Sequence, residues 1–376
     1  MMHLLSDLLG RPATEIDTPA LVVDLDAMER NLATMAAFAA KHKVKLRPHA
    51  KMHKSATLAK LQMAHGAVGV CVQKTSEAEA LAGLGVNNIY ISNEVVSPFK
   101  LKRVVAVARE LDDLGGQLAI AVDSLEGVKR LAHAAHGQHT LIRVLVEIDV
   151  GQGRCGVTPG SAGVALVEEI KRHPSLQFDG LQAYHGRAQH LRSVAERQQS
   201  IAQVISDVKA TQAALQAAGH AVPLVTGAGT GTFALEAASG VYGELQAGSY
   251  LFMDRDYAGN EHDPAQPSFE HALFVKSQVM SVCASHAVID AGHKCHAIDS
   301  GLPAVHGLAL EYANGGDEHG ILRGAVLPAL GDTVWLIPGH CDPTVNLHDH
   351  LLGVRGGLGH GTVEQIIRVD GRGALT

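Results

Sequence analysis

An eightfold alternation of β-rich runs and helical stretches, continuing to about residue 250, constrains the fold of this chain more than any other feature. The β-rich runs are Val44–Pro48, Val68–Val72, Asn88–Ser92, Leu118–Val122, Ile142–Ile148, Phe178–Tyr184, Pro223–Thr226 and Tyr242–Gln246. Strands connected through helices pair in parallel with right-handed crossovers, so this order predicts an α/β fold. Eight such units in roughly 230 residues match the size of a (β/α)8 TIM barrel. A doubly wound open sheet is the alternative that the pattern leaves open.

The helical stretches carry apolar residues at helical spacing. One precedes the first strand and begins at Asp26, with apolar residues at Met28, Leu32, Met35 and Ala39. The others that the pattern defines are Pro98–Leu111, Ser161–His173 and Leu191–Ala218. They would cover the outside of the barrel.

The pattern changes after about residue 255, where helical periodicity mostly disappears. Short runs separated by Gly, Pro and Asp then predict an all-β domain. These runs are Leu273–Met280, Ala287–Asp290, Thr333–Ile337, Leu351–Val354 and Val363–Val369. The early run Ala20–Asp24 is not needed for the barrel, so we expect it to join this sheet. We therefore predict a barrel over residues 25–255 and a β-domain formed by residues 1–24 and 256–376.

The composition excludes several classes of function. Lys plus Arg is 31 against 38 for Asp plus Glu, a net charge of −7, and aromatic residues make up 4 %, so nucleic-acid binding is not expected. No run approaches the roughly 18 apolar residues of a membrane span, and the N-terminus lacks the basic region and cleavage site of a signal peptide. The five cysteines show no framework spacing, so we expect a cytoplasmic location.

Glycine-rich loops follow the last two predicted barrel strands. The first reads TGAGTGTF, with Gly227, Gly229, Thr230 and Gly231, and the second reads QAGSY, with Gly248 and Ser249. Glycines leave backbone N–H groups free to approach a ligand, and the loops after strands 7 and 8 are the usual phosphate site of a barrel. Either loop alone could simply make a turn, but the pair predicts a site for a single phosphate. Neither string matches a dinucleotide fingerprint.

A basic run, RPHAKMHK, follows the first predicted barrel strand and contains Lys51. Arg47, His49, His53 and Lys54 flank this lysine, and like charges nearby would lower its pKa. A lowered pKa is what a lysine needs to form an imine. The alternative is a solvated basic loop, which a neighbouring phosphate site makes less attractive.

A histidine-rich segment towards the C-terminal end, PGHCDPTVNLHDH, offers a metal site within the predicted β-domain. In an extended segment, residues two apart share a face, so His340 and Asp342 can bind one ion while Cys341 points the other way. Histidine with a carboxylate favours Mn²⁺ or Mg²⁺, whereas histidine with a thiolate would favour Zn²⁺. Solvated loop polarity is the alternative for this segment. Weaker candidate ligands are Asp317, His348, Asp349 and His350.

Together these segments resemble the D-threonine aldolase and 3-hydroxy-D-aspartate aldolase family. The resemblance rests on RPHAKMHK, VCVQKTSEAEA, EIDVGQGRCGV, LQAYHG, TGAGTGTF, ELQAGSYLFMD, DEHG and PGHCDPTVNLHD, which cover nearly the whole chain in order. Members of this family are pyridoxal-phosphate enzymes with the alanine-racemase-like fold, related to metal-dependent D-serine dehydratases. In those dehydratases the second metal-ligand position is typically cysteine, so Asp342 matches the aldolases.

The resemblance implies a role for each matching residue. Lys51 would form the imine with pyridoxal 5'-phosphate, and Arg154 would bind the phenolic oxygen of the cofactor. Gln73 and Tyr184 would line the cofactor ring. The phosphate would be held by Thr230, Gly231, Gly248, Ser249 and Tyr257. One departure is Ala228, where another glycine is expected, and a methyl group there should be tolerated only if the φ angle of that residue is negative.

The resemblance also implies a reaction, the cleavage of a β-hydroxy-D-amino acid into glycine and an aldehyde. His190 is the first candidate for the base that removes the β-hydroxyl proton, and a metal-bound water is the second. A dehydratase on the same scaffold, acting on D-serine or D-threo-3-hydroxyaspartate, would release ammonia and an oxo-acid instead. A non-catalytic pyridoxal-phosphate carrier and a plain metallohydrolase are further alternatives. A homodimer is expected from relatives of the fold.

Overall fold

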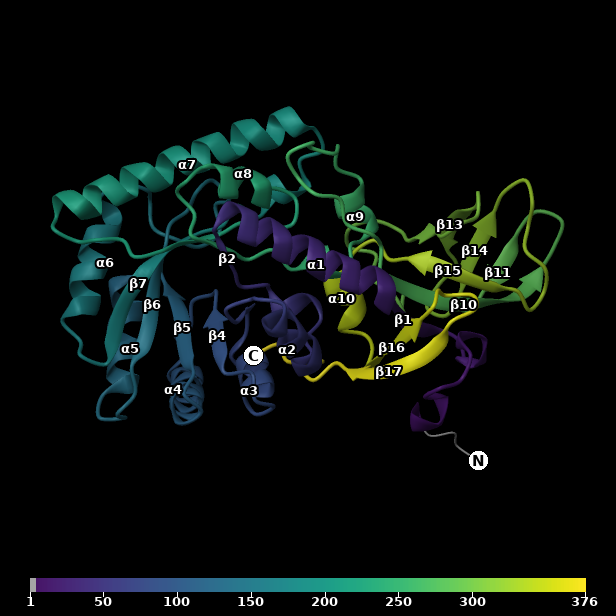
Figure 1. Cartoon of the computed structure of the whole chain (residues 1–376), viewed down its shortest axis with the longest axis horizontal. Coiled ribbons are helices and arrows are strands. Elements are labelled where there is room, and N and C mark those ends of the chain that lie inside the picture. Colours follow the sequence, from purple (N-terminus) through teal and green to yellow (C-terminus); the bar gives the residue numbers. More distant parts are fainter. Residues whose placement is uncertain (1–4) are drawn as a thin grey trace.

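The computed structural model describes residues 5–376, and its larger unit is a barrel of parallel strands (Figure 1). The strands are β2 (Lys45–Leu46), β3 (Val70–Val72), β4 (Asn88–Ile91), β5 (Gln117–Val122), β6 (Ile142–Glu147), β7 (Leu176–Ala183), β8 (Val225–Gly227) and β9 (Glu244–Leu245). They pair in the order β2-β9-β8-β7-β6-β5-β4-β3. A bond from the Val68 amide to the Leu46 carbonyl oxygen (2.8 Å) and a bridge between His49 and Cys71 join the two ends of this order. The predicted α/β barrel is confirmed, and the open sheet is wrong.

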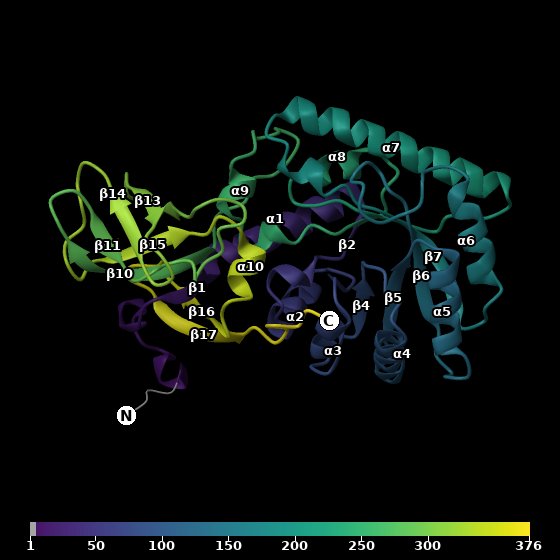
Figure 2. The ribbon, with the colours of Figure 1, turned by 180° about the vertical axis from the view of Figure 1, so that it is seen from behind.

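Helices cover the outside of this barrel (Figures 1 and 2). They are α1 (Leu25–His42), α2 (Ala56–Ala64), α3 (Thr75–Ala82), α4 (Pro98–Asp113), α5 (Leu125–Ala135), α6 (Ala162–Lys171), α7 (Val194–Ala217) and α8 (Phe233–Ala238). Local sequence determines their ends. At the start of α1 the Asp24 carboxylate accepts from the Ala27 amide, and Ser193 with Glu196 forms a capping box on α7. The four helical stretches predicted from periodicity all lie in helices.

The smaller unit is a nine-stranded, mostly antiparallel sheet. Its strands are β1 (Ala20–Asp24), β10 (Leu273–Val282), β11 (Ala287–Ile289), β12 (Ala304–Val305), β13 (Glu311–Asn314), β14 (Gly320–Arg323), β15 (Thr333–Ile337), β16 (His350–Arg355) and β17 (Thr362–Arg368). The early strand β1 pairs antiparallel with β10 and parallel with β16, as expected for a run that the barrel does not use. The chain therefore enters through this sheet, builds the barrel and returns to it.

The C-terminal region also contains helical turns, which corrects part of the sequence prediction. His340 is extended, but α10 (Cys341–Val345) follows it at once, and α9 (Arg255–Ala258) connects the barrel to the sheet. The buried Asp254 carboxylate accepts from the Cys341 amide (3.0 Å) and the Thr344 hydroxyl donates to the His340 carbonyl oxygen (2.7 Å). These bonds satisfy polar groups at the start of α10, so a helical turn replaces the extended segment that was predicted.

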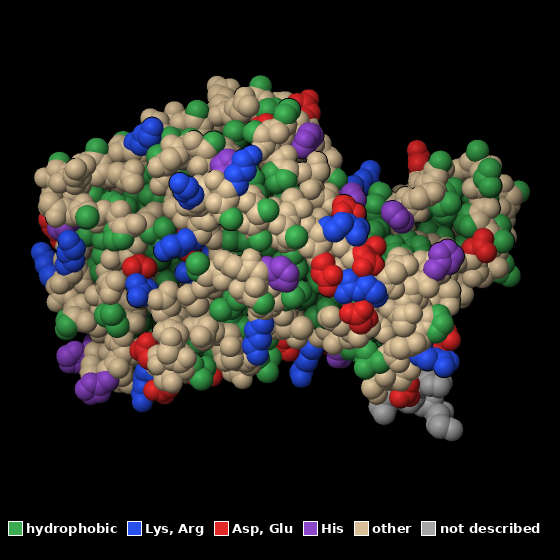
Figure 3. Space-filling model, viewed as in Figure 1, with side chains coloured by type: hydrophobic (Ala, Val, Ile, Leu, Met, Phe, Trp, Pro, Cys, Tyr) green, Lys and Arg blue, Asp and Glu red, His purple; other side chains and the backbone are tan. Residues whose placement is uncertain are grey.

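One hydrophobic core spans both units and fixes their relative position. It contains Met28 and Leu32 of α1, Leu273 and Leu336 of the sheet, and Val345 of α10. Acidic and basic side chains are mixed on the surface at this junction (Figure 3), where Arg355 pairs with Asp26 and Glu29. Helix α10 is thereby held against the 3₁₀ turn η3 (Ala50–Met52), at the mouth of the barrel. Among residues 5–376, no helix combines the length and the apolar character that crossing a membrane requires.

Candidate active site at the barrel mouth

A cavity of about 120 Å³ lies where the loops after the barrel strands meet α10. The lining includes all of the sequence-predicted site residues except Gly231: Lys51, Gln73, Arg154, Tyr184, His190, Thr230, Gly248, Ser249, Tyr257, His340 and Asp342. It also includes His49, Ser92, Gln182 and Gln246. The barrel residues meet because the carboxyl ends of parallel strands face the same end of a barrel, and His340 and Asp342 join them because α10 packs against η3.

Lys51 lies in η3, with its ammonium group 3.8 Å from the Asp342 carboxylate. Burial alone would lower the pKa of Lys51, but several acidic groups nearby, of which Asp342 acts most strongly, together outweigh burial and raise the pKa above its usual value. The lowered pKa that was predicted is therefore wrong for the protein without ligands. Its supposed cause is absent, because Arg47 pairs with Glu244 (3.0 Å) and Lys54 with Glu77 (3.2 Å), so neither cation acts on Lys51 unopposed.

His49, Gln73 and Tyr184 line the cavity beside Lys51. The His49 ring contacts the Ser92 hydroxyl (3.1 Å) and the Gln73 amide (3.2 Å). Burial holds the pKa of His49 well below its usual range, so this imidazole is uncharged. Tyr184 lies nearby, with the Arg154 guanidinium 6.0 Å from the centre of its ring. This side of the cavity therefore offers neutral hydrogen-bonding groups together with the positive charge of Arg154, which acts to lower the pKa of Lys51.

Behind Arg154 lies an acidic cluster whose function was not predicted from the sequence. Glu147, at the end of β6, is 3.9 Å from the Arg154 guanidinium. Burial and the neighbouring Glu94 raise the pKa of Glu147 to about 9, so it is protonated near neutral pH. The side-chain oxygens of Glu94 and Asp123 and the Cys155 sulfur lie within 4.8 Å of one another, and both Glu94 carboxylate oxygens are buried. None of these acidic residues lines the cavity, so they contact the site only through Arg154.

The two glycine loops form a cradle of backbone amides. Within the described residues, the amides of Gly229, Thr230, Gly248 and Ser249 have no hydrogen-bond partner. A Cβ atom on Gly248 would lie 2.7 Å from the His49 carbonyl oxygen, and one on Gly229 would lie 2.5 Å from the Gln189 side chain. The close approach therefore requires glycine at both places. Burial also raises the pKa of Tyr257, which keeps its hydroxyl protonated. Free amides and a hydroxyl donor suit a phosphate group.

Two details of the cradle differ from expectation. Ala228 has φ +69°, so the requirement for a negative φ at this residue is wrong. This left-handed conformation costs an alanine roughly 1–2 kcal/mol, which the loop accepts between two glycines. Gly231 is not in the cavity, because its amide donates to the Gln189 side chain (3.0 Å) and it lines a neighbouring cavity of about 230 Å³. Its part in holding the cofactor stays a prediction.

His340 and Asp342 are brought together despite the helical turn. The His340 Nε2 atom is 3.8 Å from Asp342 Oδ1, a buried oxygen with no hydrogen-bond partner among the described residues. The other ring nitrogen of His340, Nδ1, is 2.8 Å from Asp299, a contact typical of metal-ligating histidines. Ligands of one ion, at roughly 2.0–2.2 Å each, lie only slightly closer together than this. The pair therefore fits a divalent cation.

The other candidate ligands point elsewhere. Cys341 is buried, with its thiol donating to the Met253 carbonyl oxygen (3.2 Å), so it faces away from the pair as predicted. Asp317 pairs with His293 (3.0 Å) and His348 contacts the Cys295 carbonyl oxygen (2.7 Å), both outside the cavity lining. Asp349 is exposed and pairs with Arg372 (2.7 Å). The candidate metal ligands at the cavity are therefore one histidine and one carboxylate, with no thiolate.

His190 reaches the cavity from the 3₁₀ turn η4 (Arg187–His190), which follows β7. Its Nδ1 atom is 2.5 Å from the Asp256 carboxylate, and Arg192 pairs with the same carboxylate. Sequence reasoning missed both partners. Asp256 is in the four-residue helix α9, which has no periodicity by which it could be recognised.

Comparison with known proteins places these features in a family. Residues 23–256 match the model of the alanine racemase N-terminal domain, and residues 272–354 match that of the putative serine dehydratase domain. The chain is 43 % identical to 3-hydroxy-D-aspartate aldolase of Paracoccus denitrificans, over 97 % of this chain and 94 % of that protein. It is 44 % identical to D-threonine aldolase of an Arthrobacter species, over 97 % and 95 %. The chain belongs to the D-threonine aldolase family of alanine-racemase-like proteins.

Solved structures agree with this membership. The crystal structure of D-threonine aldolase from Filomicrobium marinum superposes with a TM-score of 0.94 at 45 % identity, covering 98 % of this chain and 99 % of that one. D-threo-3-hydroxyaspartate dehydratase from Delftia is a more distant relative, with a TM-score of 0.81 at 25 % identity over 95 % of this chain and 98 % of that one. The aldolase-family chain is thus nearer to the aldolases than to this dehydratase, in sequence and in structure.

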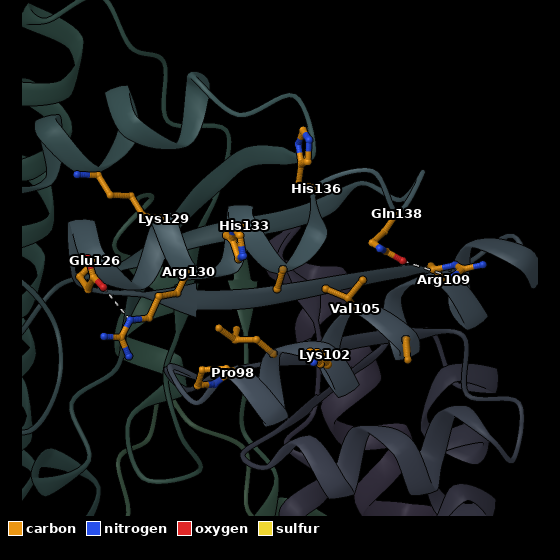
Figure 4. Close-up of a pocket in the computed structure, with 13 residues that line it drawn as sticks. Pro98, Lys102, Val105, Arg109, Glu126, Lys129, Arg130, His133, His136 and Gln138 are labelled. Carbon is orange, nitrogen blue, oxygen red and sulfur yellow. Dashed lines mark hydrogen bonds and ion pairs between the residues drawn. The ribbon is translucent and has the colours of Figure 1, made fainter.

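A larger cavity of this aldolase-family chain lies elsewhere. It has a volume of about 650 Å³ and lies on the outside of the barrel between α4 and α5 (Figure 4). Lys102, Lys129 and Arg109 line it, together with an Arg130–Glu126 pair (2.8 Å). None of the predicted site residues lies there, so size alone does not identify the active site of this molecule.

Proposed function

We propose that this protein is a pyridoxal-phosphate- and divalent-metal-dependent aldolase that cleaves β-hydroxy-D-amino acids into glycine and an aldehyde. The observation that carries this proposal is a single cavity that contains Lys51, a cradle of free amides and the His340–Asp342 pair. Lys51 offers an amine, the amides suit a phosphate group, and the His340–Asp342 pair suits a metal ion. The aldolase names of the relatives at 43 % and 44 % identity support the same reaction class.

Lys51 and the cradle fit pyridoxal phosphate. The unpartnered amides of Gly229, Thr230, Gly248 and Ser249 would receive its phosphate, and Arg154 would bind its phenolic oxygen. When bound, this cofactor serves as an electron sink for the pair of electrons left at Cα. His49 lines the same cavity and, being uncharged, would add no competing charge beside the cofactor. Lys51 would supply the amine that holds the cofactor.

His340 and Asp342 fit Mn²⁺ or Mg²⁺, because a carboxylate and an imidazole without a thiolate favour these ions over Zn²⁺. When bound, such an ion lowers the pKa of the substrate β-hydroxyl as a Lewis acid. His190 lines the same cavity with its Nε2 atom unpartnered among the described residues, so it can accept the β-hydroxyl proton. The Cα–Cβ bond then breaks and the aldehyde leaves.

A panel of β-hydroxy-D-amino acids, with their L-enantiomers as controls, tests this function. The holoenzyme is incubated with D-threonine, D-phenylserine and D-3-hydroxyaspartate in the presence of Mn²⁺, and the products are identified. Glycine and the matching aldehyde, from the D-series only, are expected. Ammonia and an oxo-acid would instead show a dehydratase, the activity named for the relative that is 32 % identical over 64 % of this chain. Cofactor binding without turnover of any substrate would show a carrier.

We also propose that the protein is a cytoplasmic homodimer. Exposed apolar side chains near the barrel mouth support the dimer: Val96 and Leu125 are nearly half exposed, and Phe99 is 81 % exposed. Such residues at one end of a barrel suit a contact between copies. Sedimentation of the holoenzyme tests this, and a monomer at micromolar concentration would contradict it.

A further inference from the structure

The environment of His190 contains a buried carboxylate that the reaction as described does not use. The Asp256 side chain is 7 % exposed, and its two oxygens have different partners. One oxygen is 2.5 Å from His190 Nδ1, and the other pairs with Arg192, whose guanidinium also donates to the Asp256 carbonyl oxygen (2.5 Å) and to the Asn260 side chain (2.8 Å). This carboxylate therefore connects the turn that carries His190 to α9, beside the contact of the His190 ring with Tyr257 (5.5 Å between ring centres).

This arrangement determines which nitrogen of His190 carries the proton. A carboxylate that is paired with Arg192 can only accept hydrogen bonds, so His190 Nδ1 must be the protonated nitrogen. The Nε2 atom then keeps its lone pair. That atom has no partner among residues 5–376, and the His190 side chain lines the cavity that contains His340 and Asp342. The basic nitrogen is thus the one available to a substrate.

The neighbouring Asp254 shows what a purely structural carboxylate in this segment looks like. It is fully buried and accepts from two backbone amides, those of Tyr257 and Cys341, each at 3.0 Å. Both of these partners are backbone groups, and neither belongs to a side chain of the cavity. Asp256, two residues further on, reaches across to another loop and meets a half-exposed histidine at the cavity. The two carboxylates therefore have different tasks.

We propose that Asp256 is a positioning residue that holds His190 as the Nδ1–H tautomer with Nε2 aimed at the substrate β-hydroxyl, and that Arg192 holds the Asp256 carboxylate in place. This rests on the proposed aldolase function. As the β-O–H bond breaks, its proton moves to His190 Nε2, its electrons form the aldehyde C=O bond, and the Cα–Cβ electron pair goes to Cα. Asp256 offsets the positive charge that His190 acquires. Cα takes up one proton and His190 releases one, so the protons balance.

Asp256→Asn tests the proposal, because an amide keeps the shape of the side chain but not its charge. We expect kcat for D-threonine cleavage by the holoenzyme to fall roughly 10²-fold or more, within the range for loss of a general base, and KM to change little. Asp256→Glu should recover part of the loss. Asp207→Asn, which changes a partly exposed carboxylate on α7 far from the cavity lining, is the matched control and should behave like the unaltered protein.

A second measurement separates positioning from general disruption. Exchange of the glycine Cα proton in D₂O, followed by NMR, needs the bound cofactor but no β-hydroxyl, so Asp256→Asn should leave its rate within a few-fold. In the His190→Ala background, Asp256→Asn should cause no further loss, because Asp256 acts through His190. Equal losses of exchange and cleavage, or a further loss in the His190→Ala background, would overturn the proposal. An unaltered protein that exchanges glycine but cleaves no β-hydroxy-D-amino acid would instead refute the aldolase function.

Discussion

The barrel side and the sheet side of the cavity recognise their ligands in different ways. The barrel side presents backbone amides from two loops. These loops depend on the absence of a side chain at Gly229 and Gly248, where a Cβ atom would lie too close to its neighbours. The sheet side presents two side chains, His340 and Asp342, on a short helical turn that other carboxylates hold in place. A phosphate site of main-chain atoms therefore depends on loop shape, whereas a metal site of side chains depends on how the second unit is placed.

The two sides are connected through Asp254. Its carboxylate caps α9, which carries Tyr257 on the barrel side, and accepts from the amide that begins α10 on the sheet side. Burial raises the pKa of Asp254 to about 6, despite the two amides that lower it. Substitutions can still affect each side separately. Those on the barrel side should weaken cofactor binding, whereas those on the sheet side should lower activity and leave the cofactor bound.

Lys51→Ala should have the largest effect, because it removes the covalent attachment on the barrel side. We expect turnover to disappear together with the yellow absorbance that borohydride bleaches. Lys45→Ala, on the exposed side of β2, is the control and should keep both. An unchanged absorbance in Lys51→Ala would show that another group carries the cofactor.

His340→Ala or chelation should remove activity and leave the cofactor bound, because the sheet side supplies only the metal. A Lewis-acid contribution of several kcal/mol corresponds to roughly 10²–10⁴-fold in rate. Asp349→Asn, which changes an exposed carboxylate on the same segment, should leave the rate unchanged. Retained activity in the presence of chelator would refute the metal site at His340 and Asp342.

The barrel side was the easier of the two to predict from sequence. Alternation of strands and helices gives the barrel, and the position of a residue just after a strand is enough to place Lys51, Gln73 and the glycine loops at its mouth. Those inferences need only the order of elements along the chain. The α/β class and the list of lining residues therefore came close to the structure.

Features that depend on pairing across distant segments could not be predicted in this way. The pKa of Lys51 was predicted with the wrong sign, because Arg47 and Lys54 meet Glu244 and Glu77, which are far away in the sequence. Asp256 and Arg192 were missed for the same reason. The helical turn at Cys341 depends on Asp254, which lies 87 residues earlier. The sequence therefore predicted the helices and strands better than it predicted which charged side chains pair with one another.

Gly248→Ala should have a smaller effect, confined to cofactor affinity on the barrel side. The new Cβ would lie 2.7 Å from the His49 carbonyl oxygen, a backbone atom that cannot move away easily. We expect pyridoxal phosphate to bind the apoprotein about tenfold more weakly, equivalent to about 1.4 kcal/mol, in an absorbance titration. Gly359→Ala, where a Cβ would meet nothing within 4 Å, is the control. Equal affinities in the two variants would argue against phosphate at this loop.

Glu147→Gln should have the smallest effect and alter how stability depends on pH. The pKa of Glu147 is about 9 in the folded protein against 4.5 for its ordinary value, so between these values the folded state holds a proton that the unfolded state releases. Raising the pH through this window therefore favours unfolding, by at most about 1.4 kcal/mol per pH unit for one group. Glutamine cannot ionise, so the variant should lose less stability between pH 5 and pH 9.

Urea unfolding of both proteins across this pH range measures the difference, with Glu168→Gln, an exposed position on α6, as the control that keeps the steeper slope. The gap between Glu147→Gln and the unaltered protein should widen as the pH rises. Coincident slopes would mean that Glu147 is charged in the folded protein and forms an ordinary ion pair with Arg154. The barrel side would then be held by charge attraction, as the sheet side is, and the contrast between the two sides would apply only to the phosphate loops.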